Sequence, residues 1–314
     1  MWIQKGKRQL QLCPIRAFSA RHAPRICLTV IAALTGCCLT AQAAVTVVDD
    51  TGRTVALSQP ARRIVSLAPD LTELLFAAGA GSALVGVSDF SDYPAEAQQI
   101  VRIGGYGRMD IERVVALQPD LVVAWHSGSS QRQLRLLQPL ALPVYQAEPR
   151  RMTDIAATLR RLGQLAGTAA VAEQTASDFE QQLAQLQPAV TDTASRVPLV
   201  YQVWHRPVMT VNGNHLISDV IERCGGRNLF AQLSVMTPAI SREAVLVAQP
   251  ALIVASGYQG EDRPPWLDEW QHWPWPSGPV SLVTIPPEWI QRHNPRILQG
   301  AARLCQAIAT RTPR

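Results

Sequence analysis

The sequence predicts an α/β fold in which two Rossmann-like lobes are joined by a single long α-helix. Apolar strand patterns alternate with helical patterns along the chain, which is typical of a parallel sheet covered by helices. Residues 110–124 also return in similar form as residues 241–255, 131 positions later. Each copy has the pattern of an N-cap residue, a short helix, a Gln-Pro stop and a buried strand. That spacing is too wide for a solenoid, and it indicates two similar lobes.

Each copy of the repeat places one glutamate, Glu112 or Glu243, in the first turn of its helix. The helix dipole favours an anion at that position. Two equivalent carboxylates, one on each lobe, suggest a bilobed binding protein with a paired acidic face. The motif alone leaves open the simpler interpretation that both glutamates only stabilise helix N-termini.

The first 43 residues differ in charge from the rest of the chain. The 314 residues are long enough for two domains, and they carry a net charge of +5. Residues 1–43 hold six of the Lys and Arg residues and no Asp or Glu, so removing them changes +5 to −1. The apparent basicity therefore gives no support for a nucleic-acid partner.

Residues 1–43 are predicted to be a secretory signal peptide. Residues 26–40 form an apolar segment that is too short to span a membrane, and small residues then precede a cleavage site after Ala43. An alternative is a lipobox at residues 34–37, which would leave a lipoprotein anchored at Cys37. The residues after Cys37 are apolar and not a polar tether, which favours cleavage after Ala43.

Cleavage after Ala43 would leave two cysteines, Cys224 and Cys305. Two cysteines in an exported protein are predicted to form a disulfide bond. Two buried free thiols are the alternative.

The elements of the first lobe follow from apolar runs and helical spacing. We interpret Asp70 as the N-cap of a helix that contains Glu73 as its capping-box partner and ends at Gly79 and Gly81. The expected order is a hairpin at 46–57, a strand at 63–68, a helix from 70, a strand at 84–87, the first repeat copy, a helix at 131–137, a strand at 143–146 and a helix at 153–165 that completes the lobe.

Residues 169–187 are predicted to form the linking helix. Apolar residues recur there at helical spacing, and Pro188 follows. At ~1.5 Å per residue this helix would span about 28 Å, enough to reach from one lobe to the other. The predicted organisation is a signal peptide at 1–43, an N-terminal lobe at 44–167, the linking helix at 168–190 and a C-terminal lobe at 191–314.

The second lobe is expected to contain a strand at 199–203, a helix at 216–224, the second repeat copy, a strand at 280–285 and a helix at 295–309. Residues 258–278 are rich in Pro and Trp, and we predict a long loop with one helical turn there. Loops of that length are uncommon unless they are functional.

Several short stretches occur in an order typical of one family. They are residues 63–69 with Thr72 and Glu73, 86–94, 109–113, 120–125, 241–243, and 288–289 with 294–297. Together they resemble the cobalamin-binding periplasmic proteins of bacterial ABC importers, within the helical-backbone metal-chelate receptor group. The resemblance covers nearly all of residues 62–312. It implies a class III periplasmic binding protein that holds its ligand between two lobes.

The resemblance implies roles for particular residues. In this group one glutamate on each lobe docks onto arginines of the membrane permease, and Glu112 and Glu243 fall on those positions. Cobalamin itself needs aromatic walls and a few polar rim groups. The matching ligand-contacting positions are Phe90, Tyr106 and Trp125 in the first lobe, Glu288 and Arg292 in the second, and Trp204 by a looser alignment. The family has aspartate where this chain has Glu288, and Trp125 could instead be a core residue at the end of its strand.

One aromatic wall of the family is missing here. The family has a tryptophan four positions before its Ser-Arg-Glu element, where this chain has Met236, Thr237 and Pro238. Either Trp273 and Trp275 replace it, or the Trp-rich segment packs on the surface of the lobe.

The implied function is capture of cobalamin in the periplasm as a transported ligand, with no resident cofactor or metal. The expected partners are cobalamin and a membrane permease, without nucleic acid, and the protein is expected to be monomeric. One alternative is a receptor for haem or a ferric siderophore on the same scaffold, with Tyr106 as an iron ligand. An enzyme is disfavoured, because no nucleophile elbow, zinc motif or phosphate-binding glycine loop occurs in the sequence.

Overall fold

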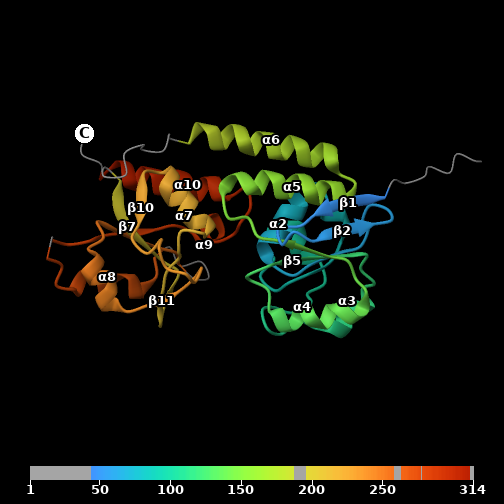
Figure 1. Ribbon diagram of the computed structural model, residues 1–314, viewed down its shortest axis with the longest axis horizontal. Coiled ribbons are helices and arrows are strands. Elements are labelled where there is room, and N and C mark those ends of the chain that lie inside the picture. The colour runs from blue at the N-terminus through green and yellow to red at the C-terminus, as the bar shows by residue number, and fades with distance from the viewer. Residues whose placement is uncertain (1–43, 187–195, 258–262, 277, 312–314) are drawn as a thin grey trace, which may run out of the picture. The chain divides into compact units, whose positions relative to one another are not determined.

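The computed structural model describes residues 44–186, 196–257, 263–276 and 278–311 (Figure 1). The predicted signal peptide, with its alternative processing sites at Ala43 and Cys37, lies outside the described residues. Within those ranges, no helix combines the length and the apolar character that a membrane span requires.

Each lobe contains a four-stranded parallel sheet. The first sheet has the order β4-β3-β5-β6 and the second the order β10-β7-β12-β13. In chain order, both are arranged as second, first, third and fourth strand, so the prediction of two similar α/β lobes is confirmed. The strands of the first sheet are β3 (Ile64–Ser66), β4 (Leu84–Val87), β5 (Leu121–Trp125) and β6 (Val144–Ala147). Those of the second are β7 (Val197–Gln202), β10 (Gly226–Asn228), β12 (Leu252–Ala255) and β13 (Ser281–Thr284).

Short helices cover the two sheets, and small β elements lie at their margins. The first lobe has the antiparallel hairpin β1 (Val45–Val48) and β2 (Thr54–Leu57), the helices α2 (Pro69–Ala77), α3 (Ile111–Ala116) and α4 (Gln131–Leu137), and the 3₁₀ turns η1 (Gly81–Ala83), η2 (Ala95–Gln99) and η3 (Gln138–Leu140). The second has α7 (Leu216–Arg223), α8 (Arg242–Ala248), α9 (Pro287–Ile290), α10 (Ile297–Ala309) and the 3₁₀ helix η5 (Pro265–His272). It also has a small antiparallel sheet of β8 (Trp204–His205), β9 (Val208–Met209) and β11 (Ala239–Ile240).

The sequence repeat is also a structural repeat. Asp110 and Ser241 cap α3 and α8, and each accepts a hydrogen bond from the backbone N–H three residues later, at 2.9 and 3.1 Å. Gln118 and Gln249, which follow the two helices, both adopt a left-handed conformation, with φ of 46° and 48°. The chain therefore turns from helix to strand in the same way in both lobes.

The predicted cap of α2 is wrong. The helix begins at Pro69, its N-cap is Ala68, and no side chain caps it. Proline suits the first helical position because its missing N–H would be unpaired there in any case. Asp70 and Glu73 therefore do not cap the helix. Both are almost fully buried, each with 4% of its surface exposed.

Two helices, α5 (Met152–Ala166) and α6 (Ala169–Gln185), lie side by side along both lobes (Figure 1). The linking helix α6 ends two residues before the predicted position, because Leu186 is already extended. At ~1.5 Å per residue it is about 25 Å long. The sequence assigned α5 to the first lobe alone. In the structure the backbone N–H of Met152 at its start also donates to Asp219 of α7, in the second lobe, at 2.8 Å.

The Trp-rich segment packs on the second lobe. The indole N–H of Trp270 donates to Gln202 at 2.7 Å, and that of Trp275 donates to the carbonyl oxygen of Trp270 at 2.7 Å. Trp270 is buried in an apolar cluster with β7, β12 and α8, and Trp273 and Trp275 pack against the same cluster. Of the two interpretations of this segment, surface packing is the one that the structure supports. Its helix, η5, is also longer than the single predicted turn.

The predicted disulfide bond is confirmed. Cys224 is the C-cap of α7 and Cys305 lies in α10, with their Cα atoms 4.4 Å apart. Both residues are buried. The bond joins two helices that cover the same sheet.

Candidate functional site

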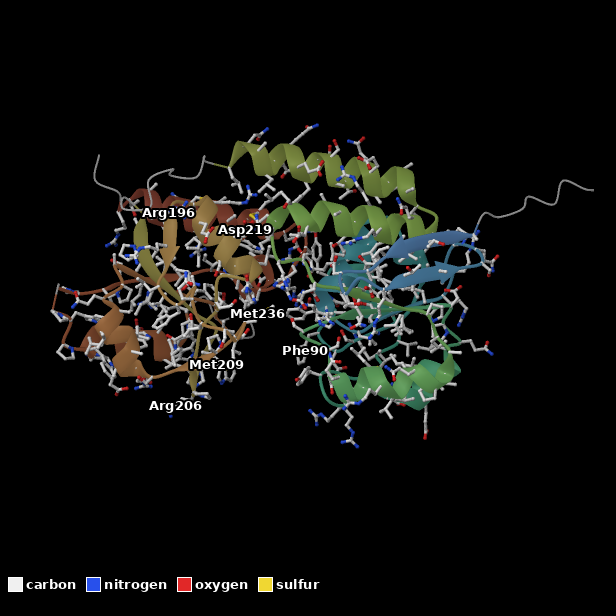
Figure 2. The ribbon with its side chains drawn as sticks, viewed as in Figure 1. Phe90, Arg196, Arg206, Met209, Asp219 and Met236 are labelled. Carbon is white, nitrogen blue, oxygen red and sulfur yellow. A yellow bond between two sulfur atoms is a disulfide. The ribbon has the colours of Figure 1, made fainter. Side chains whose placement is uncertain are left out.

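A cavity of about 700 Å³ lies between the two lobes. Four of the six predicted ligand-contacting residues line it, namely Phe90, Trp125, Glu288 and Arg292. Figure 2 shows Phe90 on the side of the first lobe that faces the second. Other residues in its lining are Pro69, Asp70, Asp92, Tyr93, Gln98, Gly257, Pro287, Gln291 and Arg296.

Tyr106 and Trp204 do not line this cavity. Tyr106 lies between Gly105 and Gly107, and 80% of its surface is exposed. Trp204 is on β8, where its ring lies 5.2 Å from that of His205. A ligand-binding role for either residue stays a prediction.

Phe90 follows β4 in an unusual backbone conformation. Its φ is +63°, which is rare for a bulky residue, and 65% of its surface is exposed. Buried hydroxyl groups hold the loop beneath it, because Thr72 donates to Ser66 at 2.9 Å and lies 3.0 Å from the hydroxyl of Ser91. Arg102 also donates to the carbonyl oxygen of Ser91 at 2.8 Å. Strained backbone supported in this way is typical of binding and catalytic sites.

Trp125 ends β5 and forms part of the cavity wall. The edge of its ring meets His293 of the second lobe, with ring centroids 5.0 Å apart. Gly128 allows this position, because a Cβ atom there would lie 1.9 Å from the indole ring. Burial lowers the pKa of His293, and it lowers that of neighbouring His215 to about 4. Both imidazoles are therefore neutral near pH 7, so this side of Trp125 carries no charge.

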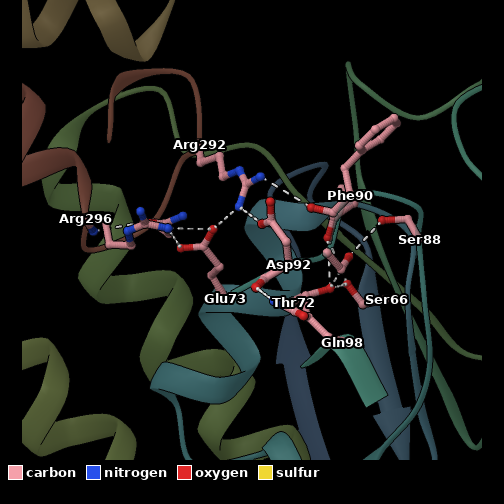
Figure 3. Close-up of polar contacts among 12 residues, drawn as sticks. Ser66, Thr72, Glu73, Ser88, Phe90, Asp92, Gln98, Arg292 and Arg296 are labelled. Carbon is pink, nitrogen blue, oxygen red and sulfur yellow. Dashed lines mark hydrogen bonds and ion pairs between the residues drawn. The ribbon is translucent and has the colours of Figure 1, made fainter. Parts of the chain in front are cut away.

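Two arginines of the second lobe bind carboxylates of the first (Figure 3). The Nη1 atom of Arg292 lies 2.6 Å from Glu73 and 2.6 Å from Asp92. The Nη1 atom of Arg296 lies 3.2 Å from Glu73, and its guanidinium stands 4.2 Å from the ring centre of Tyr93. These contacts join the lobes at the polar end of the cavity, with a cation–π contribution at its edge.

Burial raises the pKa of two carboxyl groups at this site, and an arginine lowers that of a third. It raises the pKa of Asp70 from 3.8 to about 6, against the opposing effect of hydrogen bonds from the backbone. Burial also raises the pKa of Glu73, although both arginines act in the opposite direction. At Asp92, by contrast, the hydrogen bond and charge of Arg292 outweigh burial and lower the pKa.

Sequence reasoning missed several residues of this site. Asp70 and Glu73 were interpreted as local helix caps, and Asp92, Tyr93 and Arg296 were given no role. The signal that would have found four of them is present in the chain, since Glu73, Asp92, Tyr93 and Arg296 all belong to the family stretches named above. Within the described ranges, no group of three metal-ligating side chains occurs.

The two repeated glutamates are exposed on separate helices. Glu112 lies in the first turn of α3 and Glu243 in the first turn of α8. Figure 1 shows both helices on the side opposite α5 and α6. The backbone N–H of Glu243, helped by the hydroxyl of Ser241, lowers the pKa of its carboxyl, so this group is ionised near pH 7.

Comparison with known proteins identifies relatives that cover most of this chain. Vitamin B12-binding proteins of Yersinia pestis and Yersinia pseudotuberculosis are 35% identical to the chain over 253 residues, which cover 81% of this chain and 88% of each relative.

Solved structures extend the likeness to the fold. The periplasmic vitamin B12 binding protein of Vibrio cholerae matches with a TM-score of 0.69 and 31% identity, covering 81% of this chain and 99% of that one. A periplasmic haem-binding protein of Pseudomonas aeruginosa matches with a TM-score of 0.64, over 81% of this chain and 94% of that one. Its 22% identity shows the fold alone. The family model described as periplasmic binding protein matches residues 64–269. The chain therefore belongs to the family of periplasmic binding proteins.

Proposed function

We propose that the protein captures cobalamin in the cavity between its lobes and delivers it to the permease of an ABC importer. The observation that carries this proposal is the 35% identity to vitamin B12-binding proteins over 253 residues, which include both lobes. The cavity chemistry supports it. Phe90 and Trp125 offer aromatic walls to a flat ring system, and Glu288 and Arg292 offer polar contacts to the amides on its rim.

The charges around the cavity favour a neutral ligand over an anionic chelate. Two guanidinium groups are present, and both are already paired with carboxylates of the first lobe. A ferric siderophore receptor would need cationic groups that remain available. Tyr106, the candidate iron ligand, does not line the cavity, so no specific contact supports the haem or siderophore alternative.

Absorbance spectroscopy distinguishes the two ligands. Purified protein is incubated separately with cyanocobalamin and with haemin, desalted, and scanned. Retention of the corrin spectrum near one equivalent supports the proposal. Retention of haem with no corrin would show that the haem receptor is the correct assignment.

Delivery is proposed to depend on Glu112 and Glu243. Both are exposed carboxyl side chains that can orient the protein against a basic partner. Changing both to alanine should leave cobalamin affinity nearly unchanged and abolish uptake by cells that carry the importer. A matched control replaces the exposed Glu96 and Glu222, one on each lobe, and should support normal uptake. If the variant with alanine at Glu112 and Glu243 lost cobalamin binding as severely as uptake, a docking role would be excluded.

Three further points complete the proposal. We expect the protein to be monomeric. We expect a binding role without catalysis or a resident cofactor, as in the binding proteins to which the chain is related. Export would use the signal peptide at 1–43, and mass spectrometry of the mature N-terminus distinguishes cleavage after Ala43 from lipidation of Cys37.

A further inference from the structure

We propose that Glu73 determines which ligands the cleft accepts. From the first lobe it pairs with both Arg292 and Arg296 of the second lobe, and Asp92 also pairs with Arg292, so the cleft offers guanidinium hydrogen bonds without an available positive charge. The inference deepens the proposed function, and it rests on that function for the identity of the ligand.

The geometry centres on a single buried carboxylate. The side chain of Glu73 on α2 is 3% exposed. Its Oε1 accepts from Arg292 at 2.6 Å, and Arg296 donates to both Oε2 at 3.2 Å and Oε1 at 3.4 Å. These pairs join residues 219 and 223 positions apart in the chain. Figure 3 shows Glu73 between the two guanidinium groups. Glu73 is therefore placed to set both the charge and the orientation of the arginines.

The hydrogen bonds of Arg292 indicate what it still offers to a ligand. A guanidinium has five N–H donors. Nη1 donates to Glu73 and to Asp92, and Nη2 donates to the carbonyl oxygen of Phe90 at 3.3 Å. In the part of the chain that the structure describes, this leaves the N–H of Nε and one N–H of Nη2 at a residue that lines the cavity. Two donors in a fixed plane suit the carbonyl oxygen of an amide.

The surrounding charges oppose an anion. The carboxyl and guanidinium groups that line the cavity, together with Glu73, are four and two in number: Asp70, Glu73, Asp92, Glu288, Arg292 and Arg296. Charges interact more strongly in a partly buried site than in bulk water, so an anionic group entering here meets net repulsion. Loss of the charge on Glu73 would shift this balance by one unit towards positive.

The cost of burying Glu73 argues against a purely structural role. Burial raises its pKa even though two arginines favour the ionised form, so desolvation outweighs the pairing. Replacing both members of a buried ion pair with apolar groups of similar volume is often neutral or stabilising, so a buried pair is weak evidence for a stabilising role. A carboxylate retained under these conditions is better explained by its effect on the ligand than by its effect on the fold.

The test compares two ligands on one variant. Glu73→Gln keeps the shape of the side chain and removes its charge. We expect the dissociation constant for cyanocobalamin to rise roughly tenfold, because Arg292 loses one of the two charged partners that orient it. Haemin carries two carboxylates, and its retention should increase. The melting temperature of the free protein should fall, because Arg292 and Arg296 lose a buried counter-charge.

Two variants serve as controls. Glu73→Asp keeps the charge and should still exclude haemin. Glu173 on α6 forms an exposed ion pair with Arg160 on α5, with 2.8 Å between the charged atoms. Glu173→Gln removes this carboxylate and should alter neither affinity.

The inference is overturned if Glu73→Gln leaves both affinities unchanged or moves both in the same direction. It is also overturned if Glu73→Asp, which keeps the charge, gains haemin retention as Glu73→Gln does. If the wild-type protein retains haemin and no cobalamin, the proposed function fails, and the sign of the haemin change still tests the charge argument independently.

Discussion

Changing Asp70 to asparagine should stabilise the protein near neutral pH and leave it unchanged in strong acid. Asp70 lies in the first turn of α2, lines the cavity and has 4% of its surface exposed. Burial raises its pKa from 3.8 to about 6. That difference corresponds to roughly 3 kcal/mol, the free energy by which ionised Asp70 weakens folding at pH well above 6. Asparagine keeps a side-chain oxygen for the backbone hydrogen bonds and carries no charge.

The sign of the pH dependence follows from linkage. Between pH 3.8 and about 6 the native state binds a proton at Asp70 more tightly than the unfolded state does. Stability therefore falls as pH rises through this window, and the full penalty is present above it. The variant lacks this contribution, so its advantage should grow from near zero at pH 3.5 to a few kcal/mol at pH 7.5.

Urea unfolding of both proteins across this pH range measures the effect. Other titrating groups act similarly in both proteins, so the difference in unfolding free energy isolates Asp70. A difference that stays constant across the window would refute the reasoning, as would a variant that is less stable at pH 7.5.

Three further outcomes are expected. Replacing Cys224 and Cys305 with serine should lower the free energy of unfolding by about 4–5 kcal/mol, since the closed loop spans 81 positions; equal midpoints in urea would contradict this. Trp125→Ala should weaken cobalamin binding by about 2 kcal/mol or more, measured by fluorescence quenching, and an unchanged dissociation constant would make Trp125 scaffold only. Cobalamin should scarcely alter small-angle scattering, because the α5–α6 helix pair resists bending; a clear fall in radius of gyration would refute this.

The repeat shows how far sequence patterns extend. Helix caps, helical spacing and apolar runs depend on residues within about four positions of each other, and those interactions are visible in the sequence. The caps at Asp110 and Ser241 and the paired lobes were therefore predictable. The disulfide was also predictable, because export and a count of two remaining cysteines leave one intramolecular pairing.

The cleft depended on contacts that no local pattern encodes. Glu73 satisfied a capping-box spacing, yet its partner Arg292 lies 219 positions away on the other lobe. Likewise, Trp125 follows a strand pattern and Tyr106 follows two glycines, and both were expected to line the cleft. Only the path of each loop decides that Trp125 lines the cavity and Tyr106 does not. The sequence alone determined the two lobes, the family resemblance and most of the helices and strands, although it did not predict β10 or the small sheet of β8, β9 and β11. Tertiary structure decided which side chains meet between the lobes, because that depends on how two separately folded sheets are held together by α5 and α6.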